Sequence, residues 1–183
     1  HLTVNRNKKS VELNLKTAEG QQIFKQLAAE ADVIIESFRP GVMQRLGLSY
    51  EDIVQVNERI VYCSLTGYGQ TGPYQHLPGH DINYIGYSGI LGLIGEKDGK
   101  PIVPGVQIAD IGGGSLMALA GICMALFHRD RTGKGQYIDV SMMDGAITWL
   151  YAAMSDYFAS DTTPKRGTTR LDGQFAFYNV YET

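Results

Sequence analysis

Two short segments contain side chains that could do acid-base chemistry. In the first, His80 follows Pro78 and Gly79 and stands at the start of an apolar helical stretch over 82–95. The partial positive charge of a helix N-terminus would keep an imidazole neutral, and a neutral imidazole can act as a base. The alternative is structural, with His80 capping the helix or bonding a loop carbonyl, and the local sequence alone favours this alternative.

In the second segment, Asp110 precedes a strongly apolar helical pattern over 111–131 and is predicted to be its N-cap. The run 112–114 is all glycine, which lets another group approach the backbone. Free N–H groups there could stabilise a carboxylate or a developing oxyanion. The alternative is an ordinary N-cap with glycines that allow tight helix packing, and the local sequence favours it.

Basic residues could hold the phosphates of a nucleotide-like ligand, arginine through its planar fork and lysine as a point charge. The candidates are Arg39, Arg45, Arg6, Lys8 and Lys9, with solvated surface charge as the alternative. No metal is expected, because the four histidines and two cysteines lack ligand spacing.

The segment 67–72 matches the dinucleotide pattern G-x-G-x-x-G after a predicted strand. That pattern works by placing a pyrophosphate at the N-terminus of the helix it opens. Here Pro73 and Pro78 bound a segment that does not read as such a helix. We therefore expect neither NAD nor FAD, and interpret 67–78 as a flexible loop near a site.

Bulk composition narrows the class of protein. The chain has 183 residues, of which 44% are hydrophobic, and this favours a globular domain. Its net charge of -3 gives no electrostatic reason to expect nucleic acid or an anionic membrane as a partner. Its most apolar stretch, 116–127, is short for a membrane span. Cys63 and Cys123 stand far apart in apolar segments, so we expect buried thiols and a reducing, cytoplasmic location.

Alternating strand and helix patterns predict an α/β fold with a parallel sheet covered by helices on both faces. The chain begins with His1 and its last residues, 175–183, look like a strand stopped partway, so we expect the middle of a longer protein. The predicted strands are 10–15, 32–36, 60–66 and 136–141; the predicted helices are 17–31, 42–46, 50–56, 111–131 and 142–159; 95–105 is a predicted surface loop and 160–173 a linker.

Several segments, in this order, resemble the family III CoA-transferases (the CaiB/BaiF group), which include the 2-methylacyl-CoA racemases. The resemblance covers nearly the whole chain. The racemase-like part is Gly79-His-Asp-Ile-Asn-Tyr84. The other matching segments are 5–16, 31–41, 46–48, 66–73, 109–110 and 131–136.

The resemblance implies roles for individual residues. Asp110 corresponds to the family's catalytic aspartate, which in transferases attacks the thioester to form a mixed anhydride. His80 falls where racemases keep a histidine base. In a racemase the two would face opposite sides of the substrate α-carbon, one removing the proton and the other returning it through an enolate. The contacts implied for coenzyme A, bound as acyl-CoA substrate, are Leu13, Lys16, Phe38, Arg45, Asp81 and Tyr84.

The resemblance also implies an architecture. Residues 1–159 would be the central part of a large Rossmann-like CoA-binding domain, and 160–183 a linker into a second, smaller domain. The whole protein would form an interlocked homodimer, and the chain alone would be inactive.

Three functions stay open at this point. Racemisation of a 2-methyl-branched acyl-CoA needs both His80 and Asp110, whereas transfer of CoA between carboxylic acids needs Asp110 alone. A non-enzymatic CoA-binding or dimer-scaffold module would bind CoA without turnover.

Overall fold

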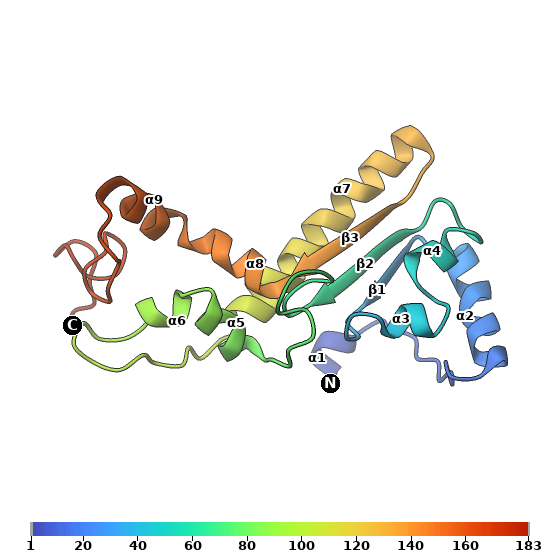
Figure 1. Cartoon of the computed structure of the whole chain (residues 1–183), viewed down its shortest axis with the longest axis horizontal. Helices are drawn as coiled ribbons and strands as arrows, with labels where there is room; N and C mark the ends of the chain where they lie inside the picture. Colours follow the sequence, from blue (N-terminus) through green and yellow to red (C-terminus); the bar gives the residue numbers. More distant parts are fainter. Residues whose placement is uncertain (1, 183) are drawn as a thin grey trace.

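A parallel sheet of three strands forms the centre of the protein. The computed structural model describes residues 2–182. The strands are β1 (Val33–Glu36), β2 (Val61–Thr66) and β3 (Gln136–Ser141), hydrogen-bonded in the order β1-β2-β3. Cys63, in the middle strand, pairs with Ile35 on one side and Ile138 on the other. All three strands therefore deliver their carboxyl ends to the same edge of the sheet (Figure 1).

One face of the sheet is covered by α2 (Ala18–Glu30), α3 (Val42–Arg45) and α4 (Tyr50–Ile53). The Thr17 side chain accepts a hydrogen bond from the Gly20 N–H and begins α2, as its sequence predicts. The buried Tyr62 of β2 donates its hydroxyl to the Leu48 carbonyl at 3.0 Å. A polar group in this core is thus satisfied by the backbone of the layer that covers it.

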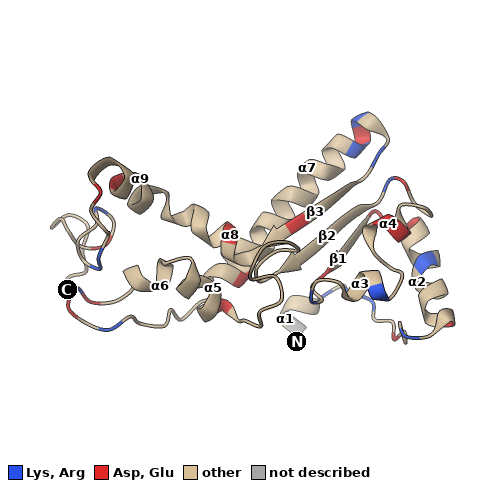
Figure 2. Cartoon of the chain, in the orientation of Figure 1, with Lys and Arg blue, Asp and Glu red and all other residues tan. Residues whose placement is uncertain are grey.

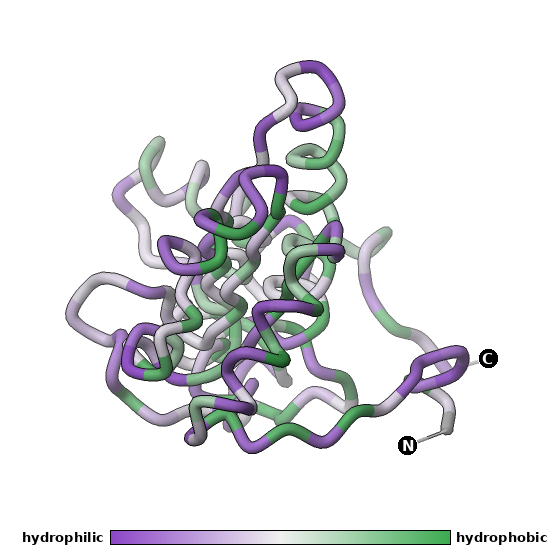
Figure 3. The backbone as a smooth tube through the Cα atoms, turned by 90° about the vertical axis from the view of Figure 1, so that its right-hand side faces the viewer, coloured by the Kyte–Doolittle hydropathy of each residue, from purple (hydrophilic) through white to green (hydrophobic). Residues whose placement is uncertain are grey.

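The other face is covered by one continuous helical segment, a π-helix η1 (Ile108–Ser115) followed by α7 (Leu116–Thr132). Ala118, Ile122 and Ala125 pack on the apolar side of β2 and β3. Gly133, at φ 79°, ends α7 in the left-handed conformation that glycine adopts without strain. In Figure 3 the helix that projects upward is green along most of its length and purple at its tip.

The combined helix Ile108–Thr132 is longer than the sequence predicted. Its 25 residues are enough, by length and composition, to cross a membrane, and among residues 2–182 it is the one helix of which this is true. Small side chains on one side of it pack against the sheet, which is how a helix of an α/β layer is used.

A third group of elements lies beyond the carboxyl ends of the strands. Tyr68, Ile85, Ala109 and Ala146 belong to a buried cluster that joins most of these elements to η1 and to the loop after β2. The elements are α5 (Asp81–Tyr87), α6 (Ile90–Leu93), α8 (Met142–Ile147), a 3-10 turn η2 (Thr148–Leu150) and α9 (Tyr151–Ser160), and the short α1 (Leu2–Asn5) lies at the other end of the chain.

The α/β class and the parallel sheet with helices on both faces are confirmed. Two predicted strands are wrong: residues 10–14 are coil and 15 begins a turn, while 175–179 form turns and bends and 180–182 are coil. Thr183 lies outside the described residues. Residues 10–15 have no neighbouring strand to bond, and Val11 is 67% exposed, so the alternating pattern has neither a ladder nor a buried face to stabilise it.

Candidate active site

A cavity of about 930 Å³ opens at the carboxyl edge of the sheet. Its walls come from the segment after β1, the end of β2 with the loop that follows, α5, and η1. His80 and Asp110, which are 30 positions apart in sequence, both line it. The fold therefore brings the two predicted catalytic residues to one cavity.

His80 is the N-cap of α5, as the sequence predicts. Its backbone N–H donates to Asn83 Oδ1 at 3.0 Å, and its carbonyl accepts the Asn83 N–H at 2.8 Å. The backbone at His80 is thereby fixed by its own helix, while the imidazole is exposed toward the cavity.

Asp110 is not an N-cap. It lies inside the first turn of η1, which begins two residues earlier and is preceded by Gln107. Burial raises the pKa of Asp110 above its ordinary value, nearby Asp81 raises it further, and His80 opposes both effects. The carboxyl group can therefore hold a proton at a higher pH than an exposed aspartate can.

The residue that caps this helix is Asp81. Its Oδ1 accepts the backbone N–H groups of Ala109 at 2.7 Å and Asp110 at 2.9 Å. Sequence reasoning placed the cap at Asp110 because the capping residue is usually adjacent in the chain. These two N–H groups are occupied, so neither is free to stabilise an oxyanion.

The glycines after Asp110 serve packing. A Cβ at Gly113 would lie 2.6 Å from the Ala146 nitrogen of α8 and closer still to the Met142 carbonyl. Gly145 of α8 approaches the Gly113 backbone in the same way. The tight-packing interpretation of this glycine run is confirmed, and it fixes η1 against α8.

Tyr84 forms the inner wall of the cavity. Its hydroxyl donates to the Gly79 carbonyl at 2.6 Å, and its ring packs edge-on against Tyr68 at 5.1 Å between centroids. A Cβ at Gly79 would lie 2.6 Å from this ring, and a Cβ at Gly67 would lie closer to it still. The Gly79-His80 turn therefore depends on glycine to fit over a buried tyrosine.

Two hydroxyls at the cavity were missed by sequence reasoning. Thr66 Oγ1 and the Tyr68 hydroxyl are buried, line the cavity, and have no hydrogen-bond partner within residues 2–182. Unpaired hydroxyls beside a cavity are available to a polar ligand atom. In the sequence they are an ordinary strand residue and a loop aromatic, so no local pattern marks them.

The loop after β2 is anchored by another carboxylate that was missed. Asp139 of β3 accepts the Gln70 N–H with both oxygens, at 3.0 and 3.1 Å. The one sequence signal for this role was an acidic residue inside a predicted strand.

The turn that follows Gly72 opens no long helix, so the G-x-G-x-x-G match lacks the structure that a dinucleotide pattern requires.

A second cavity, of about 450 Å³, adjoins the first through Arg39, Pro40 and Gln75. Arg39 and Arg45 line it. Figure 2 shows a basic residue on α3 in blue. Phe38 lines the first cavity. The same cavity is also lined by the carboxylates of Glu36 and Glu51, so the two arginines supply cations to a lining of mixed charge.

The remaining predicted CoA contacts lie elsewhere. Leu13, half-buried, and Lys16, exposed, belong to the coil before α2 and line neither cavity. Lys8 donates to Asn5 Oδ1 at 3.1 Å at the surface.

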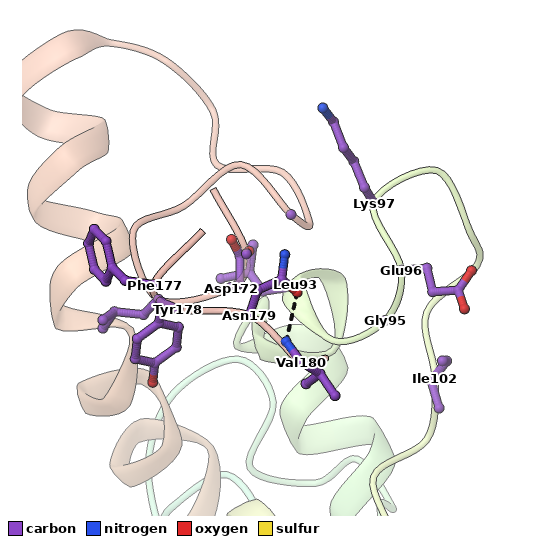
Figure 4. Close-up of a pocket in the computed structure, with 13 residues that line it drawn as sticks. Leu93, Gly95, Glu96, Lys97, Ile102, Asp172, Phe177, Tyr178, Asn179 and Val180 are labelled. Atoms are coloured by element: carbon purple, nitrogen blue, oxygen red, sulfur yellow. Dashed lines mark hydrogen bonds between the residues drawn. The ribbon is translucent and has the colours of Figure 1, made fainter. Parts of the chain in front are cut away.

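A further cavity, of about 850 Å³, lies between the loop after α6 and the tail of the chain (Figure 4). Leu93, Glu96, Phe177 and Tyr178 are among its walls. It contains no predicted site residue, and we assign it no role.

The cysteines are not paired with each other. Cys63 is buried in the sheet, and burial raises its thiol pKa to about 11. Cys123 is exposed, so its predicted burial is wrong: it lies on a side of α7 away from the sheet. Within residues 2–182 no group of three or more His, Cys, Asp or Glu side chains is arranged to hold a metal ion.

Curated relatives match over most of this chain. Acetyl-CoA:oxalate CoA-transferase of Acetobacter aceti is 45% identical over 164 residues, covering 89% of this chain and 42% of the relative. Alpha-methylacyl-CoA racemase of Mus musculus is 41% identical over 184 residues, covering 97% and 47%. The chain thus spans less than half the length of these relatives.

A solved structure also matches. A CAIB/BAIF family protein from Brucella suis superposes with a TM-score of 0.83 at 42% identity, covering 87% of this chain and 42% of that one. The family model for CoA-transferase family III matches residues 1–183. Because this model matches the whole chain and the relatives match most of it, the chain belongs to CoA-transferase family III.

Proposed function

We propose that the whole protein acts on an acyl-CoA thioester, removing the α-proton of a 2-methyl-branched acyl group and returning it to the opposite face. The observation that carries this proposal is that His80 and Asp110 line one cavity from two different elements. A racemase needs two such groups, one protonated and one not, on either side of the carbon.

The electrostatics support a proton-carrying role for Asp110. Burial and Asp81 raise its pKa, so the group can deliver a proton as well as accept one. Thr66 and Tyr68 offer hydroxyls that could donate to the thioester oxygen as negative charge develops there.

The CoA moiety would occupy the adjoining cavity. Arg39 and Arg45 could pair with its phosphates, while Phe38 and Tyr84 line the path to the acyl group. Leu13, Lys16 and Asp81, predicted contacts from the resemblance, line neither cavity.

The alternative is transfer of CoA between carboxylic acids, with Asp110 as nucleophile. Ionised Asp110 would attack the thioester carbonyl, the CoA thiolate would leave, and a mixed anhydride would form on the side chain. The transferase names of several relatives support this alternative.

The test is incubation of the whole protein with an (R)-2-methylacyl-CoA in deuterium oxide. We expect incorporation of α-deuterium together with loss of optical purity. His80→Ala should lower the exchange rate at least about 100-fold, because general acid-base groups contribute about that much. His128→Ala, which changes an exposed histidine of α7, is the matched control.

Transfer of CoA to an added carboxylate that survives His80→Ala and is lost in Asp110→Asn would make the protein a transferase. CoA binding without either activity, unchanged by Asp110→Asn, would make it a binding module and refute both proposals.

We also propose that the whole protein is a homodimer. Support comes from the apolar side chains that α7 exposes, among them Leu119 at 58% and Phe127 at 60%. A monomer mass by light scattering of the whole protein would contradict this.

A further inference from the structure

Asp81 links the two segments that carry the candidate catalytic residues. It is the first residue of α5 and follows His80 directly in the chain. Its Oδ1 accepts the N–H of Ala109 at 2.7 Å and the N–H of Asp110 itself at 2.9 Å. Hydrogen bonds to a carboxylate are about twice as strong as neutral ones.

Hydrogen bonds within α5 and its first turn also restrain the segment around His80. Within α5, the N–H of His80 is held by Asn83, and the Tyr84 hydroxyl holds the Gly79 carbonyl. Gly79, His80 and α5 therefore form one unit. The Asp81 carboxylate joins this unit to the backbone of Asp110, and Ile85 of α5 and Ala109 of η1 belong to one buried cluster. The two hydrogen bonds therefore act together with this packing to set the separation of the His80 and Asp110 side chains.

The opposite side of Asp110 is fixed by packing. The backbone of η1 at Gly113 lies against α8 with no room for a methyl group. One end of η1 is thus held by α8 and the other by Asp81. Removing the Asp81 hydrogen bonds would leave the first turn of η1 held only by the packing of Ala109, so Asp110 could shift relative to His80.

We propose that Asp81 is a positioning residue, whose side chain sets the distance between His80 and Asp110 rather than contacting the reacting atoms. Asp81 is half-buried and is not among the residues that line the 930 Å³ cavity. This inference rests on the proposed function for its kinetic test, but its structural test does not.

Two variants separate the parts of this role. Asp81→Asn keeps an oxygen acceptor and removes the charge, whereas Asp81→Ala removes both. Asp98→Asn and Asp98→Ala make the same changes in the exposed loop after α6 and serve as matched controls.

The structural test is amide hydrogen exchange in the whole protein without substrate. Asp81→Ala should speed exchange at Ala109 and Asp110 at least about 10-fold, because two N–H groups lose their acceptor. Asp81→Asn should speed it less. Wild-type exchange in both variants would overturn the proposal, whether or not the protein has the proposed activity.

The kinetic test is α-proton exchange of the acyl-CoA. Asp81→Ala should lower kcat about 100-fold with KM little changed, since displacement of a catalytic group by about 1 Å can have that effect. Asp81→Asn should recover kcat to within about 10-fold of wild type. A raised KM with unchanged kcat would instead identify Asp81 as a CoA contact and overturn the proposal.

The pH profile supplies a readout that a purely structural role would not change. The ionisable groups whose charges act with that of Asp110 are His80, Asp81 and Tyr84. Loss of the Asp81 charge should lower the Asp110 pKa, so the acid limb of kcat should move to lower pH in Asp81→Asn. If the acid limb of kcat in folded Asp81→Asn stayed at the wild-type pH, the proposed placement of Asp81 beside Asp110 would be refuted. Absence of any wild-type turnover would refute the proposed function and leave the exchange test of Asp81 standing.

Discussion

A methyl group added at Gly113 tests how tightly the helix that carries Asp110 is packed. The Gly113→Ala side chain would meet the Met142 carbonyl and lie 2.6 Å from the Ala146 nitrogen, both backbone atoms of α8. Backbone cannot rotate away as a side chain can, so the two helices must separate. Overpacking costs about 1–3 kcal/mol, and a clash with two backbone atoms belongs in the upper half of that range, at about 2–3 kcal/mol.

Helix propensity opposes this cost. Alanine is favoured over glycine inside a helix by about 1 kcal/mol. The net loss in the free energy of unfolding should therefore be about 1–2 kcal/mol. Gly86→Ala is the matched control, because Gly86 lies inside α5 and an added Cβ there has no atom within 4 Å. It should gain up to about 1 kcal/mol.

The assay is urea unfolding of the whole protein, followed by circular dichroism. With a slope of about 2 kcal/mol/M, the midpoint for Gly113→Ala should fall by about 0.5–1 M, while that for Gly86→Ala should stay equal or rise. A Gly113→Ala midpoint at or above wild type would refute the close contact between η1 and α8. It would also remove the packing support that we assign to Asp110.

Three further predictions follow from single contacts. Asp139→Ala should speed hydrogen exchange of the Gln70 amide at least about 10-fold, because that N–H loses its acceptor; an unchanged rate would show that the loop is held by other contacts. Tyr62→Phe should lower the free energy of unfolding by about 1 kcal/mol, since the buried Leu48 carbonyl loses its donor, and an unaltered urea midpoint would contradict this. The folded protein raises the pKa of Asp110, so the stability that this group contributes is fully present below its ordinary pKa of 3.8 and is lost as the pH rises through the folded value. Asp110→Asn should therefore be more stable than wild type above that range and lose this advantage in acid. A difference in urea midpoint that does not change with pH would oppose this.

Local patterns were sufficient for most of the sheet and its covering helices. The strand over 136–141 was predicted with the bounds that β3 has, because an apolar pattern between a glycine-rich C-cap and a new helix has few other solutions. The motif Gly79–Tyr84 likewise pointed to the site, since a glycine, a histidine and a helix start occur together in it.

Contacts between distant segments decided what those patterns could not. Asp110 reads locally as an N-cap, yet Asp81 caps the helix across 28 residues, which no window of sequence reveals. Residues 10–15 alternate as a strand should, but a strand exists only if another lies beside it to complete its hydrogen bonds. The sequence by itself determined which residue types are present and where helices and strands can form. Only the tertiary structure decided that His80 and Asp110 share a cavity, because the sheet and the backbone bonds to Asp81 bring together segments that the chain keeps apart.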